Sequence, residues 1–375
     1  MTAVHILEFI FIMIALVVLH EMGHMVVAKW RGMRVERFSV FFGRPLWSFT
    51  KGETQYGIGW LPLGGYVKIT GMSREELFDR EYDAEGRLIS ETPVAPEIAA
   101  RAYCNSTTPR KVATILAGPM ANVLVAIVLF AVSFWVGIPQ FDRTNEVASV
   151  AIGKPADVAN LQAGDRILSI NGVKPAKDNI DAMVTQIESN VGRTITVVVQ
   201  RDGTQRSVKV GPIVPDAQDK TIGRLGVTFQ QDVVATDRYS FFGGLGKAIT
   251  FTGELTKAQV VALGKMFTDK TTREQLSGAV GIGAAYNDNV QYGIGQVLLF
   301  SGLISLILAI MNLIPLLPLD GGHIVFALAE RVRGRNLSMA VYQRASVIGI
   351  ALVLLLAFYG FSNDISHLTG SGTRP

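Results

Sequence analysis

The sequence predicts a polytopic α-helical membrane protein with four transmembrane helices, a membrane-associated β-meander on the cytoplasmic side and an inserted α+β domain. The chain has 375 residues, of which 49% are hydrophobic and only 18% are charged. Its mean hydropathy of +0.32 is too high for an ordinary soluble protein of this length. Several apolar stretches are long enough to cross a bilayer. The alternative, a set of buried helices in a large soluble enzyme, fits this composition poorly.

The apolar stretches give the transmembrane helices in chain order. Residues 4–28 are apolar apart from His5, Glu8 and one histidine–glutamate motif, and residues 112–141 and 289–319 contain no acidic or basic residue. The first stretch has neither a positively charged start nor a small-residue cleavage site, so we expect it to be retained rather than removed as a signal peptide. The predicted helices lie within residues 1–30, 111–138, 292–322 and 343–363.

Basic residues beside the predicted helices give the orientation of the chain. They gather in two loops. The first loop joins the first and second helices and has basic residues at both of its ends, and the second loop joins the third and fourth helices. These residues are Lys29, Arg31, Arg34, Arg37, Arg101, Arg110, Lys111, Arg331, Arg333, Arg335 and Arg344. By the positive-inside tendency both loops face the cytoplasm, so the termini and the segment between helices two and three face the other side. The net charge of +4 is too spread out to indicate a nucleic-acid partner.

The segments between the helices have three different patterns. Residues 31–72 alternate aromatic and β-branched residues between glycines and prolines, which predicts a β-meander lying at the membrane interface. Residues 73–98 are polar and acidic, so we expect them to be mobile within a cytoplasmic loop of residues 73–110. Residues 236–288 contain lysines among apolar residues at helical spacing, which predicts an amphipathic connector at the membrane surface, although a helix packed on the protein would look the same.

Residues 144–232 read as a compact domain of short strands and helices, with turns at Asn171-Gly172 and Asp202-Gly203. This order of elements, together with the text GDRILSING at residues 164–172, resembles a PDZ domain. The resemblance implies a module that accepts an extended peptide, such as the outer tail of a substrate, along a sheet edge or restricts access. The candidate peptide-binding loop is Leu225, Gly226 and Val227, which a plain strand entry would explain equally well.

The motif HEMGH in the first helix carries the chemistry. His20 and His24 are one helical turn apart, about 6 Å along the axis, so both imidazoles can bind one ion, with Glu21 beside them as general base. This is the spacing found in zinc hydrolases. Ionisable groups are costly in a bilayer, and a metal explains them better than polar pairing between packed helices does.

A catalytic zinc ion takes three protein ligands and leaves one position for water. The only cysteine and two of the other histidines lie in the cytoplasmic loop or near the outer face: Cys104, His5 and His367. Asp320 and His323, at the cytoplasmic end of the third helix, lie at a depth comparable with His20, so both remain candidates for the third ligand. Pro315 and Pro318 break the helix there and would let the chain approach a metal in an extended form. Without the histidine motif, Asp320 would be interpreted as the cap of a helix at the membrane interface.

Taken in order, four features resemble the site-2 protease family. They are HEMGH, the text GPMAN at residues 118–122, the PDZ-like domain, and Asn312-x-x-Pro315 followed by LDGG at residues 319–322. The resemblance implies one zinc ion bound by His20, His24 and Asp320. It also implies that Glu21 is the catalytic acid and base, and that Asn312 holds the substrate or the developing oxyanion.

The resemblance further implies that the meander presents the substrate strand, through Gly57, Ile58, Gly59, Gly64, Gly65 and Tyr66. The implied substrates are single-span membrane proteins, such as anti-sigma factors, and remnant signal peptides. They would be cut within a bacterial inner membrane, with the PDZ domain and both termini in the periplasm and the active site towards the cytoplasm. Some family members carry two tandem PDZ domains, whereas this chain has room for one.

Two other functions fit part of the pattern. A non-catalytic PDZ-containing membrane scaffold would use the zinc ion structurally, and its function would survive Glu21→Gln. A metal transporter would use the same ligands but would need a continuous polar path, and the outer halves of the predicted helices have almost no polar residues.

Overall fold

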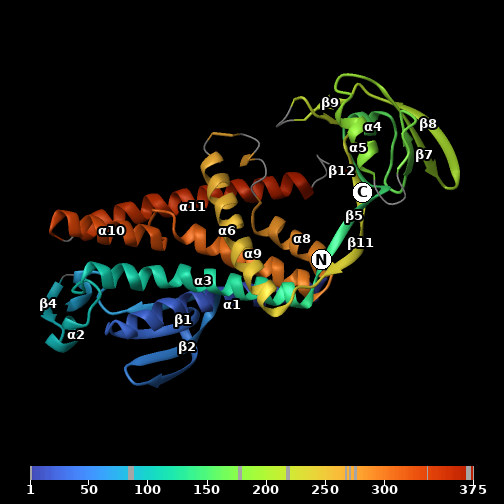
Figure 1. Ribbon diagram of the computed structural model, residues 1–375. Helices are drawn as coiled ribbons and strands as arrows, with labels where there is room; N and C mark the ends of the chain where they lie inside the picture. Colours follow the sequence, from blue (N-terminus) through green and yellow to red (C-terminus); the bar gives the residue numbers. More distant parts are fainter. Residues whose placement is uncertain are drawn as a thin grey trace. The chain divides into compact units, whose positions relative to one another are not determined.

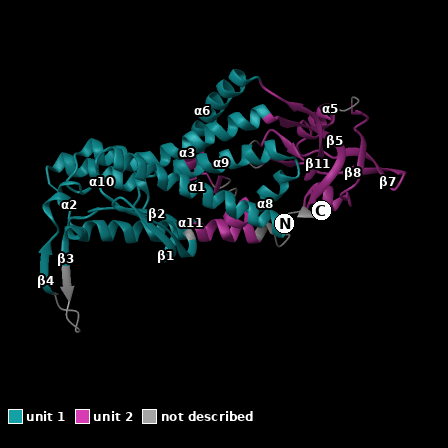
Figure 2. Cartoon of the chain, turned by 90° about the horizontal axis from the view of Figure 1, so that it is seen from below, with its two compact units in different colours: residues 1–135, 240–261, 283–356 teal, residues 136–239, 262–282, 357–375 magenta. Residues whose placement is uncertain are grey.

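The computed structural model describes residues 2–82, 88–175, 180–216, 220–266, 268–269, 272–273, 277–335, 337–368 and 373–374. Parts of the predicted loop 73–110, of the inserted domain 144–232 and of the connector 236–288 lie outside these residues. The chain divides into two compact units, which are coloured separately in Figure 2. Unit 1 comprises residues 1–135, 240–261 and 283–356, and unit 2 comprises residues 136–239, 262–282 and 357–375.

Long apolar helices dominate unit 1 (Figure 1). In the described part of the chain, 4 helices are long and apolar enough to cross a membrane: α1 (Ala3–Trp30), α3 (Thr108–Val136), α9 (Ile294–Asn312) and α11 (Met339–Leu368), the last of which continues into unit 2. The other long helices are α6 (Phe241–Lys265), α8 (Ala279–Val290) and α10 (Asp320–Arg333). Within the predicted third span, residues 292–322, α9 ends at Asn312 and α10 begins at Asp320. Pro315 and Pro318 lie in this break, because they cannot donate the backbone hydrogen bonds of a continuing helix.

Small residues let three of these helices approach one another closely. A Cβ atom on Gly23 of α1 would lie 2.5 Å from the carbonyl oxygen of Ala117 in α3. A Cβ atom on Gly302 of α9 would lie 2.6 Å from the ring of Phe130 in α3. Helices in lipid gain little from apolar burial against each other, so close backbone packing of this kind holds them together.

The segment 31–72 forms a long hairpin that doubles back on itself, rather than a meander, because residues 37–40 pair both with residues 65–68 and with residues 55–58. Strand β1 (Val35–Lys51) pairs antiparallel with β2 (Thr54–Ile69), and Gly52, with φ of +66°, makes the turn. The shift in register between Pro45 and Trp47 marks an irregularity in the pairing, because proline has no N–H to donate to the ladder. The later part of β1 and the facing part of β2 expose large apolar side chains, among them Leu46, Trp47 and Trp60.

The next segment contains more regular structure than its polar composition predicts. It comprises a single 3₁₀ turn, η1 (Arg74–Leu77), the paired strands β3 (Phe78–Tyr82) and β4 (Leu88–Pro93), and the short helix α2 (Pro96–Ala100). Backbone hydrogen bonds between Tyr103 and Thr70 and between Cys104 and Gly71 tie its end to the hairpin. The β3–β4 ladder and these backbone hydrogen bonds therefore stabilise a segment that has few apolar side chains to bury.

Unit 2 contains an antiparallel sheet with the strand order β11-β5-β6-β7-β8. The strands of this path are β5 (Ile138–Ala151), β6 (Arg166–Ile170), β7 (Ile195–Arg201), β8 (Thr204–Val210) and β11 (Val227–Asp237). The short strands β9 (Val214–Pro215) and β10 (Gly223–Arg224) pair with each other, and β12 (Thr373–Arg374) pairs with β5. The helices are α4 (Pro155–Val158) and α5 (Asp181–Glu188).

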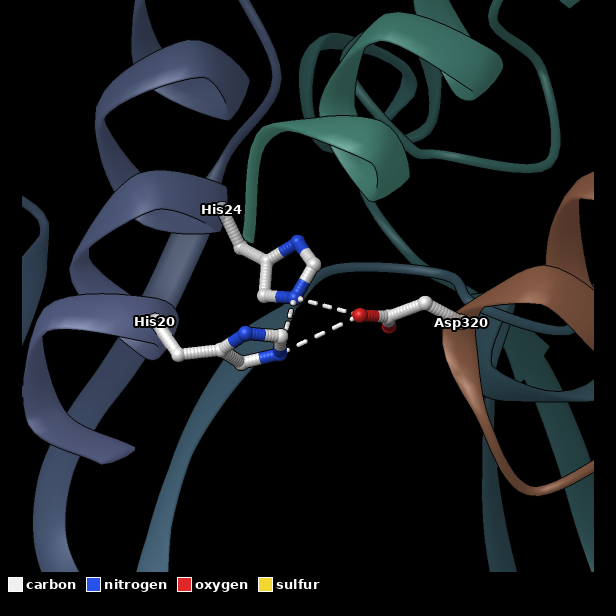
Figure 3. A group of neighbouring side chains, drawn as sticks. All are labelled: His20, His24 and Asp320. Atoms are coloured by element: carbon white, nitrogen blue, oxygen red, sulfur yellow. Dashed lines mark hydrogen bonds and ion pairs between the residues drawn. The ribbon is translucent and has the colours of Figure 1, made fainter. Parts of the chain in front are cut away.

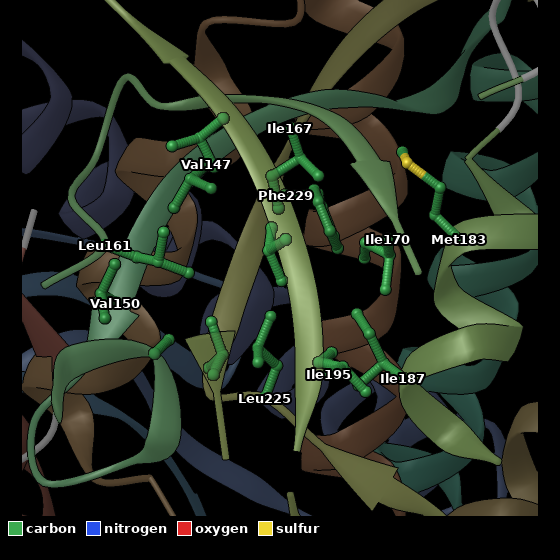
Figure 4. Close-up of a cluster of buried hydrophobic side chains, with 14 of the residues drawn as sticks. Val147, Val150, Leu161, Ile167, Ile170, Met183, Ile187, Ile195, Leu225 and Phe229 are labelled. Carbon is green, nitrogen blue, oxygen red and sulfur yellow. The ribbon is translucent and has the colours of Figure 1, made fainter. Parts of the chain in front are cut away.

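Buried aliphatic side chains from this sheet and from α5 form the core of unit 2 (Figure 4). Ile195, Val197 and Val199 alternate along β7 with less buried residues, which is the period of two expected for a strand with one face in a core. Met183 and Ile187, four residues apart on α5, cover this face.

A buried ion pair joins two segments of unit 2. The side chain of Asp165 has no exposed surface, accepts two hydrogen bonds from Arg201, at 2.6 and 2.7 Å, and accepts one from the Gln162 N–H. Burial by itself raises the pKa of Asp165, but the Arg201 guanidinium and the Gln162 N–H outweigh burial, so the pKa lies below its usual value. The stability that this pair contributes is therefore complete above the unfolded-state pKa of about 3.9, and it is lost as the pH falls through the lower folded-state pKa.

Replacing Asp165 by Asn should destabilise unit 2 locally at neutral pH. The change removes a charged partner from Arg201 and costs about 2 kcal/mol, which corresponds to amide exchange about 30-fold faster in residues 166–201. Hydrogen exchange of the full chain, read by mass spectrometry, measures this rate. Asp202→Asn, at an exposed turn beside the same arginine, should change exchange little. Equal exchange in the two variants would contradict the assigned role of Asp165.

Candidate metal centre

Two histidines lie on the one buried stripe of α1. The buried residues of this helix are Leu16, His20, His24 and Ala28, each four positions after the last. At 3.6 residues per turn this spacing keeps them on one face. The HEMGH motif therefore presents both imidazoles to the protein interior.

Asp320 meets these histidines from another part of the chain. The Nε2 atoms of His20 and His24 are 3.2 Å apart, and they lie 3.1 and 3.3 Å from the Oδ2 atom of Asp320 (Figure 3). Zinc–ligand bonds of about 2.0–2.1 Å in a tetrahedron give ligand–ligand distances of about 3.3–3.4 Å. The three atoms therefore have the spacing of three ligands of one tetrahedral ion.

The hydrogen bonding of these side chains also fits a cation. His24 Nδ1 lies 2.9 Å from the carbonyl oxygen of Thr114, which can only accept, so Nδ1 carries a proton and neutral His24 has its lone pair at Nε2. In the described part of the chain, the buried Oδ2 atom of Asp320 has no hydrogen-bond partner. The lone pair of His24 Nε2 and the Asp320 carboxylate oxygen are then two acceptors that face each other, and a divalent cation such as zinc satisfies both.

The loop before Asp320 depends on two glycines. A Cβ atom on Gly321 would overlap the carbonyl oxygens of Leu313 and Ile314, and one on Gly322 would overlap the backbone at Leu317. The chain therefore turns back tightly against the end of α9 and starts α10 at Asp320. Asp320 reaches the histidines as the first residue of a helix rather than from an extended segment.

The other candidates near Asp320 lie outside the three-residue group. His323 is one turn further along α10, with its ring 6.5 Å from the ring of Tyr342. Asn312 is the last residue of α9 and is half-buried. The structure thus brings Asp320, and not His323, to the two histidines.

The hairpin reaches the catalytic glutamate candidate through its second strand. The N–H of Val67 donates a hydrogen bond of 3.1 Å to Oε2 of Glu21, and a Cβ atom on Gly65 would lie 3.7 Å from Cγ of Glu21. Gly64, at φ of +69°, lies beside Val17, and the Tyr66 hydroxyl accepts a hydrogen bond from Arg37. Residues 64–67 of β2 therefore lie against α1 at Glu21, beside the group formed by His20, His24 and Asp320.

The remaining predicted binding residues lie elsewhere. Gly57, Ile58 and Gly59 are in the part of β2 that lies between two stretches of β1, because Gly57 and Ile58 pair with residues 39–40 and also with residues 47–48. Leu225, Gly226 and Val227 belong to unit 2, where Leu225 is in the core, Gly226 has φ of +85° and Val227 begins β11.

Helix α3 supplies neighbours of the site that sequence reasoning did not assign. A Cβ atom on Gly118 would overlap the imidazole of His24. The fully buried side chain of Asn122 lies 3.3 Å from Nδ1 of His20. The signal available in the sequence was a polar Asn in an apolar helix, four residues after a glycine.

A buried ion pair fixes the helix that carries Asp320. Nζ of Lys111, near the start of α3, lies 3.1 Å from Oε2 of Glu330 in α10. Oε1 of Glu330 accepts the N–H of Leu337. Both charged groups are nearly buried, so this pair holds α10 against α3.

The chain is similar to known proteases along nearly its whole length. Residues 8–356 match peptidase family M50. A protein of Rhizobium meliloti named as a zinc metalloprotease is 32% identical over 96% of each chain. Zinc metalloprotease RasP of Geobacillus kaustophilus is 27% identical over 96% of this chain and 97% of its own, and regulator of sigma-E protease RseP of Salmonella typhimurium is 27% identical over 96% and 98%. The chain therefore belongs to peptidase family M50, and it is a zinc metalloprotease of the site-2 protease type.

Proposed function

We propose that this enzyme cleaves transmembrane segments of single-span membrane proteins, with His20, His24 and Asp320 as its zinc ligands. The observation that carries the proposal is the convergence of two Nε2 atoms and one carboxylate oxygen within 3.3 Å of one another, on an apolar helix long enough to span a membrane. Anti-sigma factors and remnant signal peptides are the substrate classes that this activity would suit.

Each neighbouring group has a role in the proposed hydrolysis. A zinc ion bound here polarises the peptide carbonyl and lowers the pKa of water towards about 7. The Glu21 carboxylate, held at one oxygen by the Val67 N–H, takes the proton of the attacking water and returns it to the leaving amine. Asn312, the last residue of α9, is the proposed donor of a hydrogen bond to the substrate or to the developing oxyanion.

The hairpin is the proposed platform for the substrate strand. Carbonyls in a transmembrane helix are already hydrogen-bonded, so the substrate must unwind before it can be cut. Strand addition to β2 would replace the lost backbone hydrogen bonds. Gly57 to Gly59 and Gly64 to Tyr66 are the proposed contact residues. Strand addition fits residues 64–66, because the described ladder pairs Gly65 and Tyr66 with β1 on one side only and the neighbouring Val67 N–H meets Glu21. Gly57 and Ile58 already pair with β1 on both sides, so they would contact the substrate without adding a ladder.

For unit 2 we propose a periplasmic PDZ domain that binds the outer tail of the substrate or limits its access. β11 ends the strand order of the sheet, so its outer edge can pair with an extended peptide, and the loop Leu225, Gly226 and Val227 leads into it. With both termini also periplasmic, the metal centre lies towards the cytoplasmic face of a bacterial inner membrane.

Removing Asp320 tests the proposal. In cells that also express a tagged single-span substrate, Asp320→Ala should reduce cleavage to the background level, because two ligands do not hold catalytic zinc. Immunoblots of substrate and product measure this. Asp288→Ala, an exposed acid of α8, is the control and should cleave like the wild type. Unchanged cleavage by Asp320→Ala would refute the assigned site.

A further inference from the structure

Both proposed histidine ligands turn their Nδ1 atoms towards helix α3. His24 Nδ1 donates to the backbone carbonyl of Thr114. His20 Nδ1 lies 3.3 Å from the amide nitrogen Nδ2 of Asn122. Thr114 and Asn122 lie two turns apart on α3, so one helix faces the outer side of both imidazoles.

The contact between His20 and Asn122 has a chemical requirement. A histidine that binds a metal through Nε2 carries its remaining proton on Nδ1, and that N–H needs an acceptor. An amide nitrogen is a donor and cannot fill this role. Asn122 is completely buried, so water does not reach the contact from solvent, and its Oδ1 atom has no hydrogen-bond partner within the described residues.

We propose that Asn122 is the positioning residue for His20, with its amide oxygen accepting the Nδ1–H when zinc is bound. Rotating the amide by 180° exchanges two atoms of similar size and places Oδ1 against the imidazole. The backbone carbonyl of Asn122 is held independently, because Ser305 Oγ of α9 donates to it at 2.8 Å. Asn122 thus fixes the tautomer and ring orientation of His20, as Thr114 does for His24. This inference rests on the proposed zinc ligands.

The test compares variants that differ in the acceptor. Asn122→Leu removes the oxygen at similar volume, and Asn122→Asp keeps it. In the full-length protein in detergent, zinc affinity is measured by competition with a chelator, alongside thermal unfolding of the metal-free protein. We expect zinc binding to be about 10–100-fold weaker in Asn122→Leu and no weaker than wild type in Asn122→Asp. Ser305→Ala, which removes only the bond to the Asn122 backbone, should leave zinc affinity unchanged.

Each outcome decides the inference. Wild-type affinity in Asn122→Leu overturns it, and so does equal weakening in the Leu and Asp variants, which would mean that the oxygen is not what matters. If Asn122→Leu does not fold, Asn122→Ala removes the acceptor without adding apolar atoms. His20→Ala separates the two proposals: full affinity there refutes the zinc ligands, whereas lost affinity there with full affinity in Asn122→Leu refutes only the role of Asn122.

Discussion

Replacing Glu21 by Gln is expected to abolish peptide hydrolysis while zinc remains bound. Glutamine has the same shape, and its Oε1 can still accept the N–H of Val67, so the hairpin contact persists. An amide cannot take a proton from water at neutral pH, and general base catalysis contributes about 10²–10⁴-fold. We expect kcat to fall at least 10³-fold. Cleavage kinetics on a purified single-span substrate, together with zinc content by elemental analysis, measure both effects.

The control for this variant lies on the same helix. Glu8→Gln makes the identical change near the outer end of α1, where Glu8 accepts a hydrogen bond from Tyr286, and it should leave kcat unchanged. Activity retained by Glu21→Gln would refute its catalytic role and would favour a scaffold with a structural zinc ion. Loss of zinc together with activity would instead place Glu21 among the groups that maintain the metal centre.

Gly118→Ala is expected to weaken zinc binding without replacing a proposed ligand. The added methyl group would overlap the imidazole of His24. The movement of helix α3 is limited by its hydrogen bond to α9, because the Asn122 carbonyl accepts the Ser305 hydroxyl. Overpacking costs about 1–3 kcal/mol, and turning His24 away relieves it at the expense of one ligand. Zinc affinity should therefore fall by at least the 10–100-fold typical of disturbed ligand support.

Chelator competition on the purified protein measures this loss. Gly246→Ala is the matched control, because a Cβ atom at this position of α6 would meet no atom within 4 Å. It should bind zinc like the wild type. Full zinc affinity in Gly118→Ala would show that α3 or His24 can move aside, and the close fit between them would then not be what positions the ligand.

Local signals made much of the architecture predictable. The long apolar helices follow from composition over about 20 residues, because a bilayer leaves few other structures for such segments. The pairing of His20 with His24 follows from helical periodicity alone. The predicted meander is instead a hairpin that doubles back on itself, because the composition of residues 31–72 indicates strands but does not fix which of them pair.

Contacts between distant segments could not be derived in this way. Sequence depth alone left Asp320 and His323 both open as the third ligand, and the fold-back at Gly321 brings Asp320 to histidines about 300 residues earlier in the chain. The contact between Val67 and Glu21 likewise depends on how the hairpin packs against the helices. The contacts of Gly118 with His24 and of Asn122 with His20 depend on how α3 packs against α1. The sequence by itself determined the membrane helices and the histidine pair, since both depend on neighbouring residues. Only the tertiary structure decided which of Asp320 and His323 joins them and which residues pack against them, because those choices are set by packing between segments far apart in the chain.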